Sequence, residues 1–146
     1  GNATILNSCS YPLYIWSQDS ASSAPSSTPL LPNTIYREPL RAPCLHCGVS
    51  LKISKNPLHA DQITQFEYSL SDDAVWYDIS LIDCVEGDDA SHCPGHEAGL
   101  QVVAGTNDYG CGKMECKPGE TCKESVYYVP VPGQKQPVGR CNRGAG

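Results

Sequence analysis

Two neighbouring stretches, FEYSL at 66–70 and WYDISLID at 76–83, carry the clearest structural pattern in the chain. Large apolar side chains alternate with polar ones along both stretches, so that one face collects Phe66, Tyr68, Leu70, Tyr77, Ile79 and Leu81. A period of two residues is typical of β-strands that bury one face. Turn-forming residues at 71–73 separate the stretches, which predicts a hairpin of two strands over 63–70 and 75–82.

The rest of the chain is a series of short β-like runs, and no window has the apolar spacing of an amphipathic helix. We expect strands at Thr4–Ser8, Leu13–Ser17, Asn33–Leu40, Val49–Ser54, Leu100–Ala104, Val126–Val131 and Val138–Cys141. The first two are expected to join around residues 9–12, and the last two to form a closing hairpin. Ser20–Pro29 and Cys84–Gly99 consist mostly of small, polar and turn-forming residues, which predicts loops. Short strands separated by turns favour an all-β antiparallel sandwich.

Length indicates the number of domains, and charge excludes some classes of partner. The 146 residues are the length of one ordinary domain, so we expect residues 1–146 to form a single β-sandwich domain with a Cys-rich loop region at 84–122. A formal net charge of −6 argues against nucleic acid and anionic membranes, which bind clustered positive charge. No apolar run approaches the roughly 20 residues of a spanning helix, so no membrane span is expected.

Nine cysteines in a chain of this length indicate a disulfide framework made in an oxidising compartment. Because nine is odd, at least one thiol stays free or forms an intermolecular disulfide. The chain opens with Gly1 rather than Met, which we interpret as an N-terminus processed after removal of a secretion signal. Asn2-Ala3-Thr4 is an N-glycosylation sequon, as expected of a secreted, extracellular glycoprotein.

Two motifs carry a resemblance to a known family. ATILNSCSYP at 3–12, followed by Trp16, is similar to the first strand of thaumatin-like proteins, where an A-T-F-x-x-x-N-x-C-x-Y pattern leads into a strand with a Trp. The predicted hairpin resembles the A-E-F-x-L … F-Y-D-V-S-L-V-D-G-F block of that family, with a connecting turn two residues shorter here. Tyr127-Tyr128 before a final Cys is also similar to the small secreted yeast-phase-specific proteins of fungi.

The resemblance implies a thaumatin-like antiparallel β-sandwich stabilised by disulfides. Typical members are longer and carry a Cys-rich middle domain, which must be reduced or absent in 146 residues. A terminus-to-terminus bridge between Cys9 and Cys141 is also implied. The other pairings stay open among Cys44, Cys47, Cys84, Cys93, Cys111, Cys116 and Cys122. The last three are clustered, which suggests local pairing within their segment and to Cys84 or Cys93.

The resemblance also implies a functional surface. Larger thaumatin-like proteins have an acidic cleft associated with β-1,3-glucan binding, and the matching motif positions here are Glu67, Asp78 and Asp83. The arginine of the cleft corresponds to Arg41 or, as a second choice, to Arg37. Independently of the family, Glu67 and Asp78 should lie side by side on paired strands, pointing away from the apolar face. Asp83 lies an odd number of residues from Asp78, so it reaches the same face only after a bulge or bend.

Such a surface is expected to bind cell-wall polysaccharide such as β-glucan without turnover, because carboxylates accept hydrogen bonds from sugar hydroxyls. One alternative is a weak endo-β-1,3-glucanase that uses Glu67 with Asp78 or Asp83. The other is an effector-type module that engages a host or microbial protein. The resemblance places all three in a defence-related or antifungal setting. We expect a monomer or weak dimer without a cofactor.

Two plainer interpretations stand beside these. The acidic face can be an ordinary solvated sheet surface next to the polar side of the strand at 49–54. Residues 44–47, CLHC, together with Cys84 and Cys93, have the ligand types of a zinc site. In a secreted, Cys-rich chain disulfides are favoured over zinc, so no metal is expected.

Overall fold

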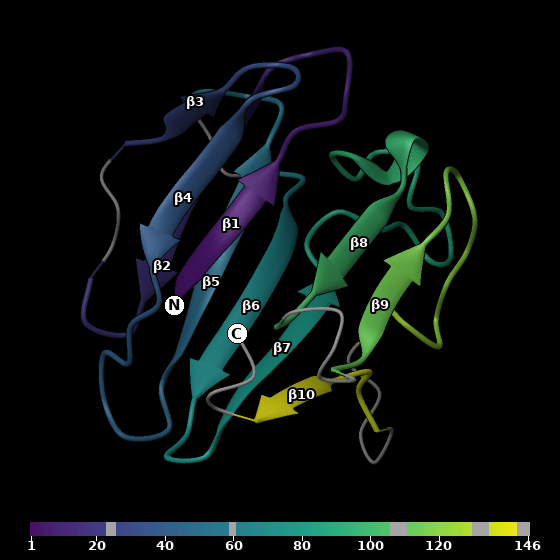
Figure 1. Ribbon diagram of the computed structural model, residues 1–146. Helices are drawn as coiled ribbons and strands as arrows, with labels where there is room; N and C mark the ends of the chain where they lie inside the picture. The colour runs from purple at the N-terminus through teal and green to yellow at the C-terminus, as the bar shows by residue number, and fades with distance from the viewer. Residues whose placement is uncertain (23–25, 59–60, 106–110, 130–134, 143–146) are drawn as a thin grey trace.

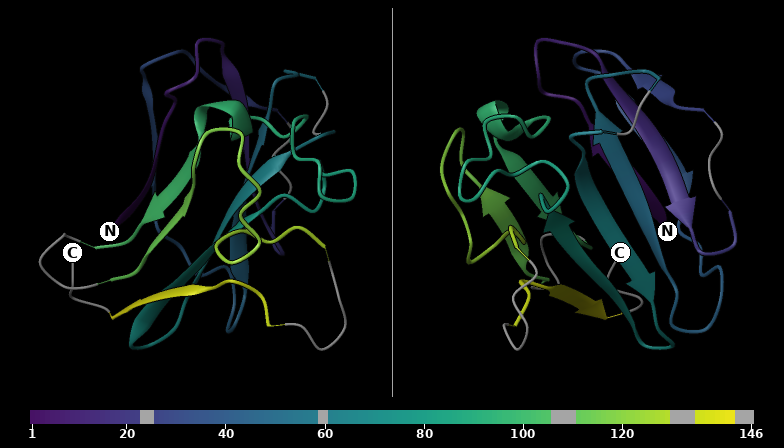
Figure 2. Two further views of the ribbon diagram at one scale, coloured as in Figure 1. Left: turned by 90° about the vertical axis from the view of Figure 1, so that its right-hand side faces the viewer. Right: turned by 180° about the vertical axis from the view of Figure 1, so that it is seen from behind.

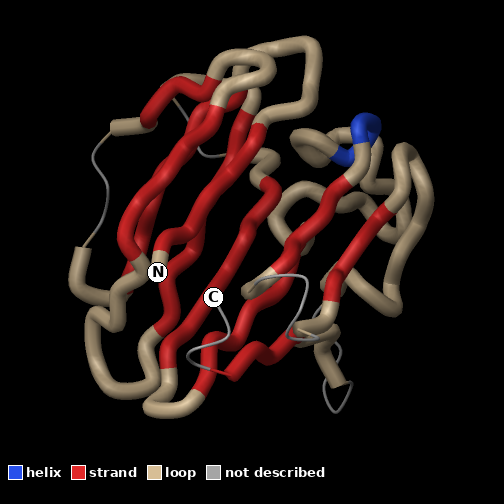
Figure 3. Tube along the Cα trace, in the orientation of Figure 1, coloured by secondary structure: helices blue, strands red, loops and turns tan. Residues whose placement is uncertain are grey.

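The computed structural model describes residues 1–22, 26–58, 61–105, 111–129 and 135–142 (Figure 1; Figure 3). These residues form β1 (Asn2–Leu6), β2 (Leu13–Asp19), β3 (Thr28–Leu30), β4 (Ile35–Pro39), β5 (Gly48–Ser54), β6 (Thr64–Leu70), β7 (Ala74–Ser80), the 3-10 turn η1 (His96–Ala98), β8 (Leu100–Val103), β9 (Lys113–Cys116) and β10 (Gly139–Asn142). Within these ranges, no helix is long and apolar enough to cross a membrane.

The strands form one large antiparallel sheet and two small ones. The large sheet has six strands in the order β10-β7-β6-β5-β2-β3, while β1–β4 and β8–β9 are two-stranded. Figure 1 shows the two small sheets in front of the large one, as the second layer of a β-sandwich. We call the face of the large sheet that meets this layer the inner face. The opposite, outer face is turned to the viewer in the view from behind (Figure 2, right).

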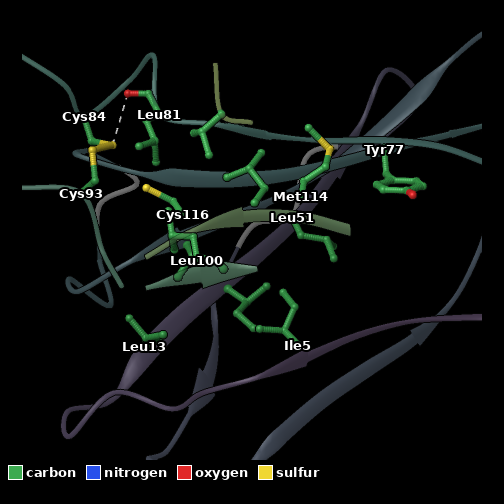
Figure 4. Packing of buried hydrophobic residues seen from close by; sticks show 14 of the residues in the cluster. Ile5, Leu13, Leu51, Tyr77, Leu81, Cys84, Cys93, Leu100, Met114 and Cys116 are labelled. Atoms are coloured by element: carbon green, nitrogen blue, oxygen red, sulfur yellow. Dashed lines mark hydrogen bonds between the residues drawn. A yellow bond between two sulfur atoms is a disulfide. The ribbon is translucent and has the colours of Figure 1, made fainter. Parts of the chain in front are cut away.

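The core lies between the layers and follows from the alternation of side chains. Buried residues of the large sheet include Ile15, Val49, Leu51, Ile53, Tyr68, Tyr77 and Ile79. Ile5 of β1, Leu100 of β8 and Met114 of β9 complete the same cluster from the second layer (Figure 4). Burying one large apolar side chain of this kind stabilises the fold by roughly 1.5–3 kcal/mol. The hairpin predicted from the alternation is present as β6–β7, with Tyr68 opposite Tyr77.

Strand pairing near the C-terminus differs from the expectation, whereas the first two strands are joined around residues 9–12 as expected. The joined strands β1 and β2 pair with other strands, β1 with β4 and β2 with β3 and β5. Thr28–Leu30, in a segment partly predicted as loop, forms β3 at the edge of the large sheet. The predicted C-terminal hairpin is wrong for its described residues: β10 pairs with β7, and Tyr127 makes a parallel bridge to Ser80. Residues 130 and 131 of that prediction lie outside the described residues.

The buried side chain of Asn7 explains why β1 and β2 separate. Its Nδ2 donates to the carbonyl oxygens of Tyr11 at 2.9 Å and Leu30 at 3.0 Å, and its Oδ1 accepts from the N–H of Cys9 at 2.9 Å. A buried amide without such partners is costly, so these bonds fix the path of the loop. The chain therefore crosses from the second layer into the large sheet instead of folding back on itself.

Four disulfides join Cys44 to Cys47, Cys84 to Cys93, Cys111 to Cys141 and Cys116 to Cys122, and the thiol of Cys9 is free. The expected Cys9–Cys141 bridge is therefore wrong. Cys141 lies on β10 opposite Val75, at an edge of the large sheet. Cys9 is buried after β1, where its sulfur adjoins Gly95. The two sulfurs thus belong to different regions, and Cys111 is the cysteine beside β10.

The expected local pairing of the clustered cysteines is confirmed for one disulfide only. Cys116–Cys122 is a local bridge within the segment where local pairing was expected. Cys84 and Cys93 bond to each other rather than to that segment. Because both pairs 44–47 and 84–93 are disulfides, their thiolates are not available as zinc ligands.

β10 lies against β7 at a close approach between a glycine and an aromatic ring. A Cβ atom on Gly139 would stand 2.2 Å from Cε2 of Tyr77, which is far inside van der Waals contact. The buried ring therefore passes over the backbone of Gly139, and its hydroxyl donates to the carbonyl oxygen of Gly112. Only glycine leaves room for this ring position.

Candidate carboxyl cluster on the outer face

The outer face of the large sheet carries two of the predicted carboxyl groups as direct neighbours. The pairing of β5, β6 and β7 places Ser50 opposite Glu67 and Glu67 opposite Asp78. The residues that follow them in sequence on β6 and β7, Tyr68 and Ile79, are buried on the inner face. Glu67 and Asp78 therefore point to the outer face, as the alternation predicts.

Burial and mutual repulsion perturb the ionisation of this pair. Glu67 and Asp78 are half-buried and hydrogen-bonded to each other. Burial raises the pKa of Glu67, and burial together with the charge of Glu67 raises the pKa of Asp78 to about 7. In mildly acidic solution Asp78 thus keeps its proton, which it directs toward Glu67. Its other oxygen, Oδ1, is buried without a protein partner among the described residues.

Asp83 also joins the outer face, because β7 ends before it. The strand ends at Ser80, and the N–H of Cys84 donates to the carbonyl oxygen of Leu81 at 3.0 Å, which closes a turn. This turn interrupts the strand alternation that would otherwise direct Asp83 to the opposite face. The chain therefore has the bend that is needed to bring Asp83 to the same face as Glu67 and Asp78.

Gln65 and Lys52 complete the cluster, and neither was predicted as a site residue. The buried Gln65 amide donates to Asp83 Oδ2 at 2.9 Å and accepts from the Ser50 hydroxyl at 2.9 Å. Lys52 stands opposite Gln65, and its charge lowers the pKa of Glu67 against the larger effect of burial. Strand register alone places both residues beside Glu67, so a pairing of the 49–54 and 63–70 runs would have found them.

An exposed aromatic ring lies next to the carboxyl groups. Trp76 is two residues before Asp78 on β7, so it shares the outer face, and it is 38% exposed. The guanidinium of Arg140, the residue opposite it on β10, stands 5.3 Å from the centre of the ring. Trp76 alternates with the apolar-face residue Tyr77 on β7, so the sequence pattern already places it on the polar side.

Neither candidate arginine belongs to this cluster. Arg41 donates from Nε to Asp19 at 2.8 Å, from Nη1 to Glu38 at 2.6 Å and from Nη2 to Ser17 at 3.0 Å. Ser17 and Asp19 follow the inner-face alternation of β2, so Arg41 lies on the opposite side of the large sheet from Glu67. Arg37 stands on β4 of the second layer, opposite Thr4. The expected grouping of Arg41 with the carboxyl groups is thus not formed, because its loop returns to the inner face.

Two further features lie apart from the cluster. A cavity of about 440 Å³ beside β9 and β10 is lined by Lys113, Lys123, Glu124 and Lys135 among others. Within the described residues no three His, Cys, Asp or Glu side chains are grouped to hold a metal ion. Asn2 of the sequon is exposed as the first residue of β1.

Comparison with known proteins gives the chain a family. A family model described as Bys1, Blastomyces yeast-phase-specific protein, matches residues 1–143. An antigenic thaumatin-like protein of Arthroderma benhamiae is 32% identical over 126 residues, which is 86% of this chain and 58% of the relative. The secreted thaumatin-like protein calA of Emericella nidulans is 30% identical over 129 residues, 88% of this chain and 70% of the relative. The chain thus spans little more than half the length of the Arthroderma protein.

A solved structure matches the fold over nearly the whole chain. The crystal structure of the protein elicitor MoHrip2 from Magnaporthe oryzae has a TM-score of 0.71 and 21% sequence identity, covering 97% of this chain and 90% of that one. This likeness confirms the predicted disulfide-stabilised, all-β fold, and the two relatives confirm the thaumatin-like resemblance. The protein is therefore a small thaumatin-like protein that belongs to the Bys1 family of Blastomyces yeast-phase-specific proteins.

Proposed function

We propose that this protein is a secreted, non-enzymatic binding protein for cell-wall polysaccharide, with β-glucan as its ligand. The observation that carries the proposal is the grouping of Glu67, Asp78 and Asp83 beside the exposed ring of Trp76 on an open sheet face. Carboxylates accept hydrogen bonds from sugar hydroxyls, and an aromatic ring offers an apolar surface to the C–H groups of a sugar. An open sheet face suits an extended polysaccharide chain better than a small, enclosed ligand.

The cluster contains both acceptors and a donor of hydrogen bonds. With the Asp78 proton directed to Glu67, the cluster offers carboxyl oxygens as acceptors and the second N–H of the Gln65 amide as a donor. A neutral sugar has hydroxyl groups that both donate and accept hydrogen bonds. Oδ1 of Asp78 is buried and has no partner among the described residues, so it is an acceptor that a bound water molecule would satisfy.

Secretion is supported by the disulfides and by one relative. Four disulfides are typical of proteins that fold in an oxidising compartment. The printed name of the Emericella nidulans relative describes that protein as secreted. Asn2 is exposed, so its sequon is accessible for the glycosylation that we propose for the secreted chain.

A sedimentation assay on insoluble β-1,3-glucan tests the binding. We expect the wild type to be retained, Trp76→Ala and Asp83→Asn to lose most of the retention, and Trp76→Tyr to recover part of it. Asp72→Asn is the matched control, because it removes an exposed carboxylate from the β6–β7 turn instead of the cluster. Equal retention of wild type, Trp76→Ala and Asp83→Asn would show that the outer face is an ordinary solvated surface.

A protein-interaction module is the second candidate, and a different surface favours it. Leu6 and Ile35 are cross-strand partners on β1 and β4, and they are 58% and 57% exposed. Two adjacent exposed aliphatic side chains on a sheet suit a protein partner more than a sugar. The fold relative MoHrip2 is described as a protein elicitor. Loss of activity in an elicitation assay for Leu6→Ser with Ile35→Ser, with glucan retention intact, would favour this candidate.

A further inference from the structure

We propose that the disulfide of the C-x-x-C loop Cys44-Leu45-His46-Cys47 is a thiol–disulfide exchange site whose substrate is a cysteine-bearing peptide segment. Cys44 and Cys47 are bonded to each other across a separation of three residues, in the loop between β4 and β5. This activity is separate from polysaccharide binding, because the loop precedes β5 and contributes no residue to the outer-face cluster.

Exposure distinguishes this disulfide from the other three. Each of the others includes at least one buried cysteine: Cys84 and Cys93, Cys116, and Cys141. Cys44 is exposed and Cys47 is half-buried. A thiolate must approach along the S–S bond to react, so exchange is selective for disulfides that solvent can reach. The C-x-x-C bridge is therefore the first one open to attack.

The surroundings of the two sulfurs are unequal, which gives the exchange a direction. The hydroxyl of Ser20 donates to Sγ of Cys47 at 3.1 Å and stands 3.9 Å from Sγ of Cys44. A hydrogen bond to a sulfur stabilises the negative charge that develops when that sulfur leaves. Cys44 is the more exposed residue of the two, and Cys47 is the better leaving group. Attack at Cys44 with departure of Cys47 follows from this arrangement.

The reaction balances with a peptide thiol as the only co-reactant. A peptide thiolate attacks Sγ of Cys44, a new S–S bond forms, and the bond between Cys44 and Cys47 breaks. Its electron pair leaves on Cys47, which takes a proton from water. A second peptide thiolate then attacks the peptide sulfur of this mixed disulfide and releases Cys44 as a thiolate, which is protonated in turn. Two peptide thiols are oxidised to one disulfide, and Cys44 and Cys47 are reduced to thiols.

Leu45 favours a peptide over a small polar thiol. It lies between the two cysteines and is 84% exposed, the most exposed of the large hydrophobic side chains described. An apolar side chain beside the reacting sulfur gains contact with the apolar residues that flank a peptide cysteine. Glutathione is too polar to gain from the same contact.

The first experiment treats the native full-length protein with a limiting amount of a peptide whose single cysteine is flanked by leucines. Samples are quenched with acid over time and mapped by mass spectrometry. We expect the peptide adduct on Cys44, and reduction of the 44–47 bridge roughly tenfold or more ahead of the other three. An adduct that forms first on Cys47, or reduction of another bridge first, would overturn the proposal.

Two variants test the contacts, with glutathione as the comparison thiol. Leu45→Ser should slow the reaction with the leucine-flanked peptide roughly threefold and leave the reaction with glutathione unchanged. Leu58→Ser is the matched control, because Leu58 is 80% exposed in another loop, and it should change neither rate. Ser20→Ala should slow both thiols, since it removes the hydrogen bond to the leaving sulfur. Equal peptide rates in the wild type and Leu45→Ser would exclude the peptide preference, and unchanged rates in Ser20→Ala would exclude the assigned direction.

Discussion

Arg41 Nε lies 2.8 Å from Asp19 Oδ2, and this ion pair joins the end of β2 to the loop that follows β4. Arg41 also reaches Glu38 at 2.6 Å, and the Tyr68 hydroxyl donates to the same Glu38 oxygen at 3.3 Å. The side chain of Asp19 is only 4% exposed. The arginine therefore holds together the two layers of the sandwich at this end, in place of the ligand contact that the sequence suggested.

Replacing Arg41 should affect stability and leave polysaccharide binding intact. Arg41→Ala leaves the carboxylates of Asp19 and Glu38 without their cation, and unpaired buried charge is destabilising. We expect a clearly lower melting temperature by differential scanning fluorimetry, with partial recovery in Arg41→Lys and full retention on glucan below the melting temperature. A stable Arg41→Ala protein that no longer binds glucan would contradict the placement of this residue.

The close approach at Gly139 predicts a strong effect of one added methyl group. Gly139→Ala brings a Cβ atom to 2.2 Å from the buried Tyr77 ring, and overpacking of this kind costs about 1–3 kcal/mol. We expect the midpoint of urea unfolding to fall accordingly. Gly112→Ala is the control, because its Cβ atom would meet only the Tyr77 hydroxyl at 4.0 Å. Similar midpoints for the two variants would argue against this packing of β10.

The pKa of Asp78 predicts the pH dependence of stability. Its pKa is raised to about 7 in the folded protein, against about 3.9 in an unfolded chain, so the folded state binds the proton more tightly. The stabilisation from this group is complete below about pH 4 and is lost as pH rises through about 7. Asp78→Asn keeps a donor to Glu67 without titrating, so its melting temperature should decline less over this interval than that of the wild type.

The lowered pKa of Asp19 predicts that stability falls, instead of rising, as the solution becomes strongly acidic. The hydrogen bond from Arg41 lowers the pKa of Asp19 to about 2, so the stabilisation is present above about pH 3.9 and is lost as pH falls toward 2. The two carboxyl groups together place the maximum of stability in mildly acidic solution. A wild-type melting temperature that rises steadily from pH 4 to pH 8 would be incompatible with the raised pKa of Asp78.

Hydrolysis of β-1,3-glucan is not expected, and the reason is geometric. Glycoside hydrolases hold their two carboxyl groups about 5–5.5 Å apart for retention or about 6.5–9.5 Å apart for inversion. Glu67 and Asp78 are direct cross-strand partners whose carboxyl groups interact with each other, so they do not flank an enclosed site for a glycosidic bond. We expect no reducing-sugar release from soluble β-1,3-glucan. A turnover that disappears in both Glu67→Gln and Asp78→Asn would reverse this conclusion.

The free cysteine gives a direct test of the disulfide assignment. Cys9 is buried, so Ellman's reagent should detect no thiol in the native protein and one thiol per chain after unfolding without reductant. Non-reducing peptide mapping should recover a peptide pair that contains Cys111 and Cys141. A peptide pair linking Cys9 to Cys141 would restore the bridge implied by the family resemblance.

Local patterns predicted the part of the fold that local interactions determine. The β6–β7 hairpin, and with it the apposition of Glu67 and Asp78, follows from strict alternation and a short turn. The partner of β1 could not be found in this way, since its separation from β2 depends on buried bonds of Asn7 to Tyr11 and Leu30. The same holds for Arg41, whose position depends on how its loop returns to the sheet.

The cysteine pairing shows the limit of inference from resemblance. The clustering of Cys111, Cys116 and Cys122 suggested a local bridge without specifying its members, and Cys116–Cys122 is such a bridge, because a short loop keeps its ends close. The long-range partner of Cys141 depends on the neighbour that the fold brings to β10, and this is Cys111. A disulfide known from a family can be assigned to a cysteine of this chain only when its partner cysteine occupies the corresponding position in the fold.

The large sheet ends in its two shortest strands, β3 with three residues and β10 with four, while the four strands between them have seven each. Exposed sheet edges invite pairing with other chains, and short or proline-containing edges limit it. Pro29 lacks an N–H within β3, and the bond from Cys141 to Cys111 holds β10 in place. The protein is therefore protected against edge-to-edge aggregation at both margins, which matters for a chain whose broad outer face is left open.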